Sequence, residues 1–415
     1  MKSITKKLEL LAPAGSFESL MAAIQAGADS VYFGIEQLNM RTRSSSNFTV
    51  EDLQQVTALC RQHSVKTYLT LNTIIYDHDI SMMKKIVDAA RENGVDAVIA
   101  SDIAVLHYAA KTGVKVHIST QANVTNIDAV EFFAAYADVM VLSRELTLMQ
   151  VSALAKEIKR RRIKGPSGHN VRLEVFGHGA LCMAVSGKCY LSLHSDFASA
   201  NRGACVQNCR RTYIVTDKES GAELEVDNEY IMSAKDLCTI DFLDKIVEAG
   251  VSVLKIEGRG RSADYVFTTT KCYREAIEAV NDGTFSTEKV ADWKSRLSTV
   301  YNRGFWDGYY LGRTMGEWTN DYGSKATKKK IFLGKGLKYF ETAKVGEFLL
   351  ETQSLRIGDD ILITGPTTGV IQHTISALRV NDQEAESVQK GESFTMALEE
   401  KIRPSDKLYK IVDAQ

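Results

Sequence analysis

The sequence predicts an α/β protein: a TIM-like (β/α)8 barrel with a long cysteine-bearing insertion after strand 7, followed by a small C-terminal all-β barrel domain. Short apolar, β-branched runs alternate with amphipathic stretches from residue 8 onward, a pattern typical of a parallel sheet covered on both faces. Eight such runs precede residue 257, the number that closes a barrel. An open doubly wound sheet remains the alternative, but LLAPAGS has a single glycine where such sheets often carry Gly-x-Gly-x-x-Gly.

The barrel strands are expected at residues 8–12, 30–33, 66–71, 97–100, 115–119, 139–143, 172–176 and 252–256. Helical patterns such as FESLMAAIQAG and SMMKKIVDAARENG lie between them. Several of these patterns end in a glycine just before the next strand, namely Gly27, Gly94, Gly113 and Gly250. Glycine accommodates the left-handed conformation common at helix C-termini, so these positions support the boundaries.

Changes in pattern divide the chain into three parts. Residues 1–283 are expected to form the catalytic barrel domain, and 284–330 a connecting segment with aromatic and basic residues. Residues 331–415 show short alternating strands with glycine turns, such as GDDILITGP, and predict the C-terminal β-barrel domain.

Composition excludes several classes of protein. The net charge is −1, so the whole chain is not a polycation. No apolar run reaches the ~18 residues that a membrane span needs, and the N-terminus lacks the apolar stretch of a signal peptide. We therefore expect a cytoplasmic protein without membrane association. Stable disulfides are rare in that compartment, so clustered thiols indicate metal or redox chemistry.

The connection between strands seven and eight, residues 177–251, is unusually long and holds five of the seven cysteines. They are Cys182, Cys189, Cys205, Cys209 and Cys238. Only Cys205 and Cys209 have the close spacing of a zinc knuckle. An iron–sulfur cluster tolerates irregular spacings, and buried apolar cysteines are the third interpretation. Because long loops in compact domains are usually functional, we expect chemistry here.

The stretch EVFGHGALCMAVSGKCYLS at 174–192 resembles the signature of peptidase family U32, the collagenase-like proteases. ELLAPAGSFESLMAAIQAGADSVYFG, NRGACVQNCRRTY, SAKDLCTIDFL and LKIEGRGRSADYV support this resemblance, which covers most of residues 8–313. The C-terminal β segment is similar to a domain appended in many members.

The resemblance implies an enzyme of one of two kinds. Several bacterial members are linked to oxygen-independent hydroxylation of ubiquinone precursors, ribosomal RNA or the tRNA wobble uridine. With one barrel and a short β domain, this chain is most similar to the branch that makes 5-hydroxyuridine in tRNA. Proteolysis of collagen-like substrates is the alternative. The hydroxylating members carry a 4Fe-4S cluster, and the RNA branches depend on prephenate. Expected partners are tRNA and proteins that deliver electrons or iron–sulfur clusters; no oligomeric state is predicted.

Carried over residue by residue, the resemblance implies a metal site. Cys182, Cys189, Cys205 and Cys238 match the family's cluster positions. Cys209 matches a cysteine that some members use instead. Which four of the five bind the cluster stays open.

Polar residues at predicted strand ends are the other candidates, because barrel enzymes place their chemistry there. The predicted catalytic residues are Glu145, Glu257, Arg259, Arg261 and His178. Arginines suit a dicarboxylate such as prephenate, and amides suit the edge of a uracil-like base. The predicted binding residues for co-substrate and base are Arg144, Arg202, Gln121 and Asn123, with Arg41 and Arg43 as further arginines. His117 lies inside a strand and is expected to pack in the barrel.

The machinery of a protease is not evident. HExxH and G-x-S-x-G are missing. A Cys182–His178 dyad would use a predicted cluster ligand. An accessory RNA-binding protein is a third possibility, and YNRGFWDGYYLGR at 301–313 has the aromatic and basic residues that stack on RNA. Packing between the barrel and the β domain explains that segment equally well.

Overall fold

The structure is a computed structural model that describes residues 8–42, 47–214, 216–221, 232–313, 315–320 and 323–414. The candidate Arg43 and residues 222–231 of the long connection lie outside these residues.

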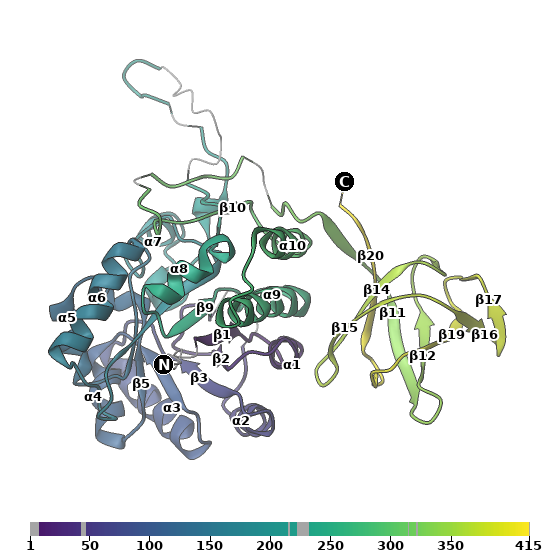
Figure 1. The fold of residues 1–415 in the computed structure, drawn as a ribbon, viewed down its shortest axis with the longest axis horizontal. Coiled ribbons are helices and arrows are strands. Elements are labelled where there is room, and N and C mark those ends of the chain that lie inside the picture. The colour runs from purple at the N-terminus through teal and green to yellow at the C-terminus, as the bar shows by residue number, and fades with distance from the viewer. Residues whose placement is uncertain are drawn as a thin grey trace.

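Eight parallel strands close into a barrel (Figure 1). They are β1 (Glu9–Pro13), β2 (Ser30–Phe33), β3 (Lys66–Thr70), β4 (Ala97–Ala100), β5 (Val116–Ile118), β6 (Val139–Val141), β7 (Arg172–Ala180) and β9 (Val253–Ile256). Strand β9 closes the ring because it pairs in parallel with both β1 and β7. The TIM-like barrel is therefore confirmed, and all eight strands lie where the sequence predicts them.

Helices surround the barrel because each buries one apolar stripe. Those that follow the strands are α1 (Phe17–Gln25), α2 (Leu53–Gln62), α3 (Ile80–Glu92), α4 (Ile103–Thr112), α5 (Ile127–Ala134), α6 (Leu148–Arg161), α8 (Leu243–Glu248) and, after the last strand, α9 (Ala263–Asn281). Helix α3 shows the pattern, since Met83, Ile86, Val87 and Ala90 are its buried residues. Helix α4 ends at Gly113 in the left-handed conformation, with φ 76°. Within the described residues, no helix combines the length and apolar character that crossing a membrane requires.

Strand β7 continues four residues past the predicted end at 176. Strand β8 (Asp236–Cys238) pairs antiparallel to this extension, with His178 opposite Cys238. Strand β10 (Phe305–Trp306) then pairs with β8. The cysteine-bearing insertion therefore begins at residue 181; it contains the short helix α7 (Leu191–Asp196) and returns through β8 to the sheet.

The aromatic segment 301–313 is packed against this region. The indole of Trp306 donates to the carbonyl of Lys235, and the Tyr310 hydroxyl donates to the carbonyl of Phe176. Both side chains are buried. Helix α10 (Thr287–Ser298) precedes the segment. The two large buried aromatics of the segment 301–313 thus bond to β7 and to the residue before β8, instead of filling the space between the two domains.

The C-terminal domain is antiparallel and all-β, as predicted. Its eight-stranded sheet has the order β15-β14-β20-β11-β12-β19-β16-β17, and β13 pairs with β18. The strands are β11 (Lys328–Phe340), β12 (Val345–Leu350), β13 (Leu355–Arg356), β14 (Asp360–Gly365), β15 (Gly369–Thr374), β16 (Leu378–Val380), β17 (Gln383–Ala385), β18 (Ser387–Val388), β19 (Ser393–Ala397) and β20 (Lys407–Asp413). Phe348 and Phe394 stack in its core with ring centroids 5.5 Å apart.

This domain lies beside α1 and α9 of the barrel (Figure 1). The Gln25 amide of α1 donates to the Thr368 carbonyl and accepts from the Val370 amide, at 2.7 and 2.9 Å. Lys330 forms an ion pair with Asp264 of α9. The contact is therefore on the side of the barrel, away from the strand ends that carry the insertion.

The barrel interior is unusually polar at its amino end. The buried Glu9 carboxylate accepts hydrogen bonds from Tyr68 at 2.6 Å and Arg172 at 2.9 Å. Lys66 is 3.2 Å away. Burial alone would raise the pKa of Glu9, but these partners outweigh it and lower that pKa to about 2. Glu9 is therefore ionised in the folded protein throughout the physiological range.

Substituting Glu9→Gln is expected to lower the free energy of unfolding by about 3 kcal/mol at neutral pH, because Arg172 would lose its buried partner. The folded pKa lies below the unfolded one, so this contribution is complete above about pH 4.5 and is lost as the pH falls toward 2. Urea unfolding of both proteins at pH 7 and pH 3 measures it. Glu157→Gln, which removes an exposed carboxylate paired with Arg160 and Arg161, is the control and should have little effect. An equal loss of stability at both pH values would contradict this account.

Candidate active site

A cavity of about 250 Å³ lies at the carboxyl end of the barrel strands. Tyr32 of β2, Thr70 of β3 and Lys255 of β9 line it from the strands. Residues of the insertion between Leu181 and Arg210 line it from the other side. The barrel therefore supplies the floor of the site, and the insertion supplies its cover.

Four of the five clustered thiols line this cavity: Cys182, Cys189, Cys205 and Cys209. Burial raises the pKa of Cys209 to about 11, the charge of Arg210 opposes that rise, and the other three thiols add to it. The four thiols are thus near enough to one another to interact electrostatically. The insertion gathers them although they span 28 residues of sequence, from 182 to 209.

Cys238 is placed elsewhere. It is buried on β8, and its sulfur lies 3.9 Å from the Tyr273 hydroxyl, which is itself 3.4 Å from Nδ1 of His178. Cys238 does not line the cavity. The structure therefore separates Cys238 from the other three cysteines assigned with it from the sequence, whereas Cys209, the predicted alternative, lines the cavity with them.

Four thiols line the cavity, and thiolates are the ligands that an iron–sulfur cluster would use. Within the described ranges, no three His, Cys, Asp or Glu side chains are close enough to hold one metal ion. A cluster requires less proximity, because each of its irons takes one thiolate and the sulfurs stand apart around it. Four thiols around one cavity are consistent with that arrangement.

Cationic side chains dominate the rest of the lining. They are Arg41, Arg144, Arg210, Arg259, Arg261, Arg303 and Lys255. Glu257 is the single carboxylate among the lining residues. The cavity therefore carries a positive charge that favours an anionic ligand.

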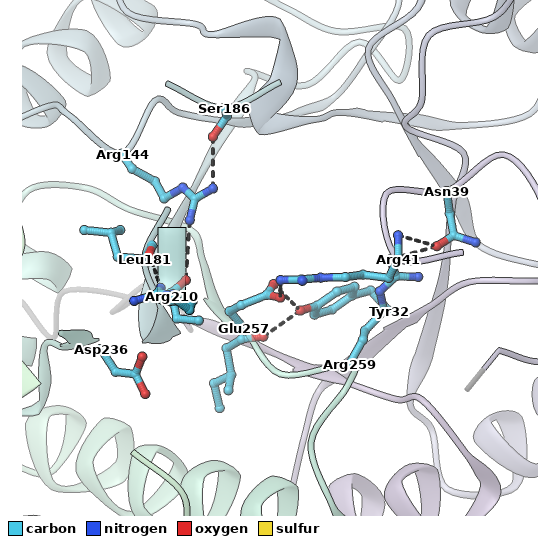
Figure 2. A network of polar contacts seen from close by, with 12 residues as sticks. Tyr32, Asn39, Arg41, Arg144, Leu181, Ser186, Arg210, Asp236, Glu257 and Arg259 are labelled. Carbon is cyan, nitrogen blue, oxygen red and sulfur yellow. Dashed lines mark hydrogen bonds and ion pairs between the residues drawn. The ribbon is translucent and has the colours of Figure 1, made fainter. Parts of the chain in front are cut away.

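Glu257 anchors part of this cationic wall (Figure 2). Its carboxylate accepts from Arg41 at 2.9 Å and from the Tyr32 hydroxyl at 3.1 Å. Burial would raise the pKa of Glu257, but the charges of Arg41, Arg259 and Arg144 lower it to about 2. An acid this strong stays ionised, so Glu257 orients Arg41 and Tyr32 and does not serve as a proton donor near neutral pH.

Arg259 is fully enclosed beside this pair. It donates to Thr70 at 2.9 Å and to Asn39 at 3.0 Å, and burial lowers its pKa to about 10. A Cβ atom on Gly34 would come within 2.1 Å of its guanidinium. Gly34, which follows β2, therefore leaves space for Arg259, which follows β9, at the edge of the cavity.

Arg144 joins the barrel to the insertion. Its guanidinium donates to the Ser186 hydroxyl at 3.0 Å and lies 4.9 Å above the Phe176 ring (Figure 2). Within the described part of the chain, no carboxylate lies at ion-pair distance from it. Arg144 can therefore offer its charge to a ligand more readily than Arg41 can.

Gln121 is held at the cavity by an amide chain. The Met40 amide donates to Asn72, and Asn72 donates to Oε1 of Gln121 at 3.3 Å. Gln121 lines the cavity, and its oxygen is fixed by these bonds. Asn123 instead donates to the Ser186 carbonyl at 3.1 Å. Gln121 thus faces the site, and Asn123 fastens the insertion over it.

The sequence model of peptidase family U32 matches residues 15–320. This chain belongs to peptidase family U32. A collagenase of Porphyromonas gingivalis is 57% identical over 97% of both chains. The tRNA hydroxylation protein P1 of Bacillus subtilis is 31% identical over 98% of this chain and 96% of that one. The 23S rRNA 5-hydroxycytidine C2501 synthase of Escherichia coli is 29% identical over 89% of this chain and 54% of that one. The family thus holds proteins named for RNA hydroxylation as well as proteins named collagenase.

Besides Cys238 and Asn123, three further predicted site residues of this U32 protein lie outside the cavity lining. His178 is 1% exposed among Tyr265, Tyr273 and Phe305, and burial lowers its pKa to about 3. It is therefore a neutral packing residue, and the Cys182–His178 dyad is not formed. Glu145 is exposed and accepts from Ser143. Arg202 is paired with Asp79 and stacks on Tyr76, so it holds the insertion to the loop after β3.

Arg261 lines the cavity just after β9, at the predicted position, and an aromatic ring contacts its side chain. Its guanidinium lies 3.5 Å from the Tyr301 ring centroid, and Arg303 lies 5.1 Å from the same ring. Arg303 is also paired with the buried Asp236 at 3.4 Å. Tyr301 therefore positions two arginines of the cavity wall.

Sequence reasoning missed Lys255 and Tyr32. Lys255 donates to the buried Glu174 carboxylate at 3.0 Å and lies 4.4 Å from the Tyr32 ring centroid. His117, which packs in the barrel as predicted, is 3.6 Å from the same carboxylate. A lysine inside an otherwise apolar strand, VLKI, was the available signal, because a buried charge needs a partner and usually a reason.

Proposed function

We propose that this protein is an iron–sulfur enzyme that hydroxylates an RNA base, with the tRNA wobble uridine converted to 5-hydroxyuridine. The observation that carries the proposal is the meeting of four thiols with a cationic cavity at the active end of a TIM-like barrel. The relatives named for tRNA and rRNA hydroxylation support the choice of an RNA substrate.

In this proposal, Cys182, Cys189, Cys205 and Cys209 hold a 4Fe-4S cluster. When bound, such a cluster supplies one-electron transfer, and with four protein ligands it has no open iron. The charge of Cys205 contributes to raising the pKa of Arg41, so the two are electrostatically linked. The Glu257 carboxylate, 2.9 Å away, holds the Arg41 guanidinium in place. Arg41 therefore interacts both with Glu257 and with one of the thiols.

Prephenate is the proposed co-substrate. Its two carboxylates match the cationic lining, with Arg144 and Arg261 as the binding arginines and Gln121 as an amide ligand. Replacing C5–H of uridine by C5–OH is a two-electron oxidation. It is balanced if the donor transfers its hydroxyl oxygen and its own C–OH becomes C–H. The chain's residues bind and orient the two reactants and exclude water, because the insertion covers the cavity.

Anaerobic purification and gene deletion test the proposal together. We expect brown, oxygen-sensitive protein with iron and sulfide in equal amounts, and loss of 5-hydroxyuridine derivatives from tRNA after deletion. Mass spectrometry of tRNA nucleosides measures the second effect. Unchanged nucleosides in the deletion strain would rule out the tRNA role, and colourless, iron-free protein would rule out the cluster. Carriers that deliver electrons or clusters are the expected protein partners.

Collagenolytic proteolysis is the second candidate, because a relative 57% identical over nearly the whole chain is named collagenase. It requires a nucleophile or an activated water in the same cavity. Purified, metal-free protein should then cleave gelatin, and one cysteine substitution should abolish the cleavage. Cleavage that copurifies with another protein on a sizing column would argue against it.

A further inference from the structure

Three strongly exposed aromatic rings lie on the insertion that covers the cavity and on a loop that contacts it. Four aromatic side chains of the described chain are more than half exposed: Tyr76 (51%), Phe132 (60%), Tyr190 (73%) and Phe197 (92%). Phe132 lies on α5, on the outside of the barrel. The other three lie on the insertion or on the loop after β3 that contacts it. Large rings left in water forgo the stabilisation of burial, so their concentration in one region calls for a binding role.

Tyr190 and Phe197 flank the short helix α7. Leu191 and Ser192 of this helix line the cavity, and Cys189 precedes it. Phe197 ends the helix with φ 51°, in the left-handed region that a bulky residue rarely adopts. Backbone strain and an almost fully solvated ring thus coincide at one residue, next to the cover of the site. Such strain is concentrated at functional positions.

The segment that carries Tyr76 contacts the insertion. The Ile74 amide donates to the Asn201 carbonyl at 3.2 Å, and Asn201 lines the cavity. The Arg202 guanidinium lies 4.3 Å from the Tyr76 ring centroid. The loop after β3, which carries Tyr76, is therefore joined to the insertion.

The insertion also carries exposed positive charges. Lys188 and Arg211 are exposed on the insertion, and the cavity behind it is cationic. Asp196 is the acidic group on α7, and it is hydrogen-bonded to Ser195 and Asn208. Aromatic rings beside positive charge are the chemistry of single-stranded nucleic-acid binding, in which bases stack on rings and phosphates meet cations.

We propose that Tyr76, Tyr190 and Phe197 form a platform on which unpaired bases of an RNA loop stack, flanking the base that enters the cavity. This inference deepens the proposed function and rests on it for the identity of the partner. The buried aromatics of 301–313 are thereby replaced as the RNA-stacking candidates.

Fluorescence anisotropy with a labelled RNA stem–loop tests the platform. Phe197→Gly, which removes the ring and also relieves the left-handed strain, and Tyr190→Ala should each weaken binding about fivefold or more. The slope of log affinity against log salt should not change, because phosphate contacts remain. Tyr190→Phe should restore binding, and Phe132→Ala, an equally exposed ring on α5, should bind as the unaltered protein does.

The outcomes separate this inference from the proposed function. Unchanged stem–loop binding by both ring-deleted variants, while tRNA hydroxylation persists, would overturn the platform alone. Ring-dependent loop binding with no hydroxylated product would keep the platform and remove the proposed reaction. Equal binding of a fully paired RNA duplex, or ring-dependent binding of a collagen-like peptide in place of RNA, would also overturn the platform.

Discussion

Substituting Cys209→Ser is expected to remove most of the iron from anaerobically purified protein, whereas Cys238→Ser should retain it. Cys209 lines the cavity with Cys182, Cys189 and Cys205, and Cys238 lies behind β7 against Tyr273. A cluster needs soft thiolate ligands, and a serine hydroxyl is a poor substitute. Iron and sulfide content per chain, with the visible absorption spectrum, measures the difference.

Cys60→Ser is the matched control, because Cys60 is a fully buried thiol on α2 far from the insertion in sequence. It should keep the iron and lose only some stability. If Cys238→Ser lost the iron and Cys209→Ser kept it, the assignment from sequence resemblance would hold. The insertion would then have to rearrange around β8 when the cluster binds.

The barrel was predictable from the sequence because its signals are local. Each strand is a short apolar run, and turns such as that at Gly113 mark the ends of helices. The extension of β7 to Ala180 was not predictable, since it depends on pairing with β8, which follows more than fifty residues later. The secondary-structure propensities of the residues in β7 contain no information about a partner strand so far along the chain. That one pairing also draws Cys238 away from the cavity.

The sequence predicts which residues lie at the site better than it predicts what each of them does there. Strand ends identified Glu257, Arg259, Arg261, Arg144 and Gln121, all of which line the cavity. The same reasoning wrongly included His178, because the strand runs on past it and turns its ring into an aromatic core. The sequence predicts Arg202 as a binding residue for an anionic co-substrate, but Asp79 from a distant loop pairs with it. Pair partners far apart in sequence decide whether a charge serves a ligand or the fold.

Substituting Arg144→Gln is expected to weaken binding of a dicarboxylate co-substrate about 100-fold while leaving the iron content unchanged. Its charge is not neutralised by a carboxylate within the described residues, and its guanidinium faces the cavity. Loss of one charged hydrogen-bonding partner in an enclosed site costs about 2–5 kcal/mol. Titration calorimetry with prephenate measures the affinity directly, and tRNA hydroxylation should fall through a higher KM for prephenate.

Two further variants distinguish the effect of the Arg144 charge from the effect of its hydrogen bond to the insertion. Ser186→Ala keeps the Arg144 charge and removes its 3.0 Å hydrogen bond to the insertion, so it should weaken binding much less. Arg160→Gln removes an exposed arginine of α6 and should have no effect. If Ser186→Ala weakened dicarboxylate binding as much as Arg144→Gln does, Arg144 would act by holding the insertion in place and not by binding the anion. The cationic cavity would then depend on Arg261 and Lys255, the former held by Tyr301 and the latter by Glu174, for recognition of its ligand.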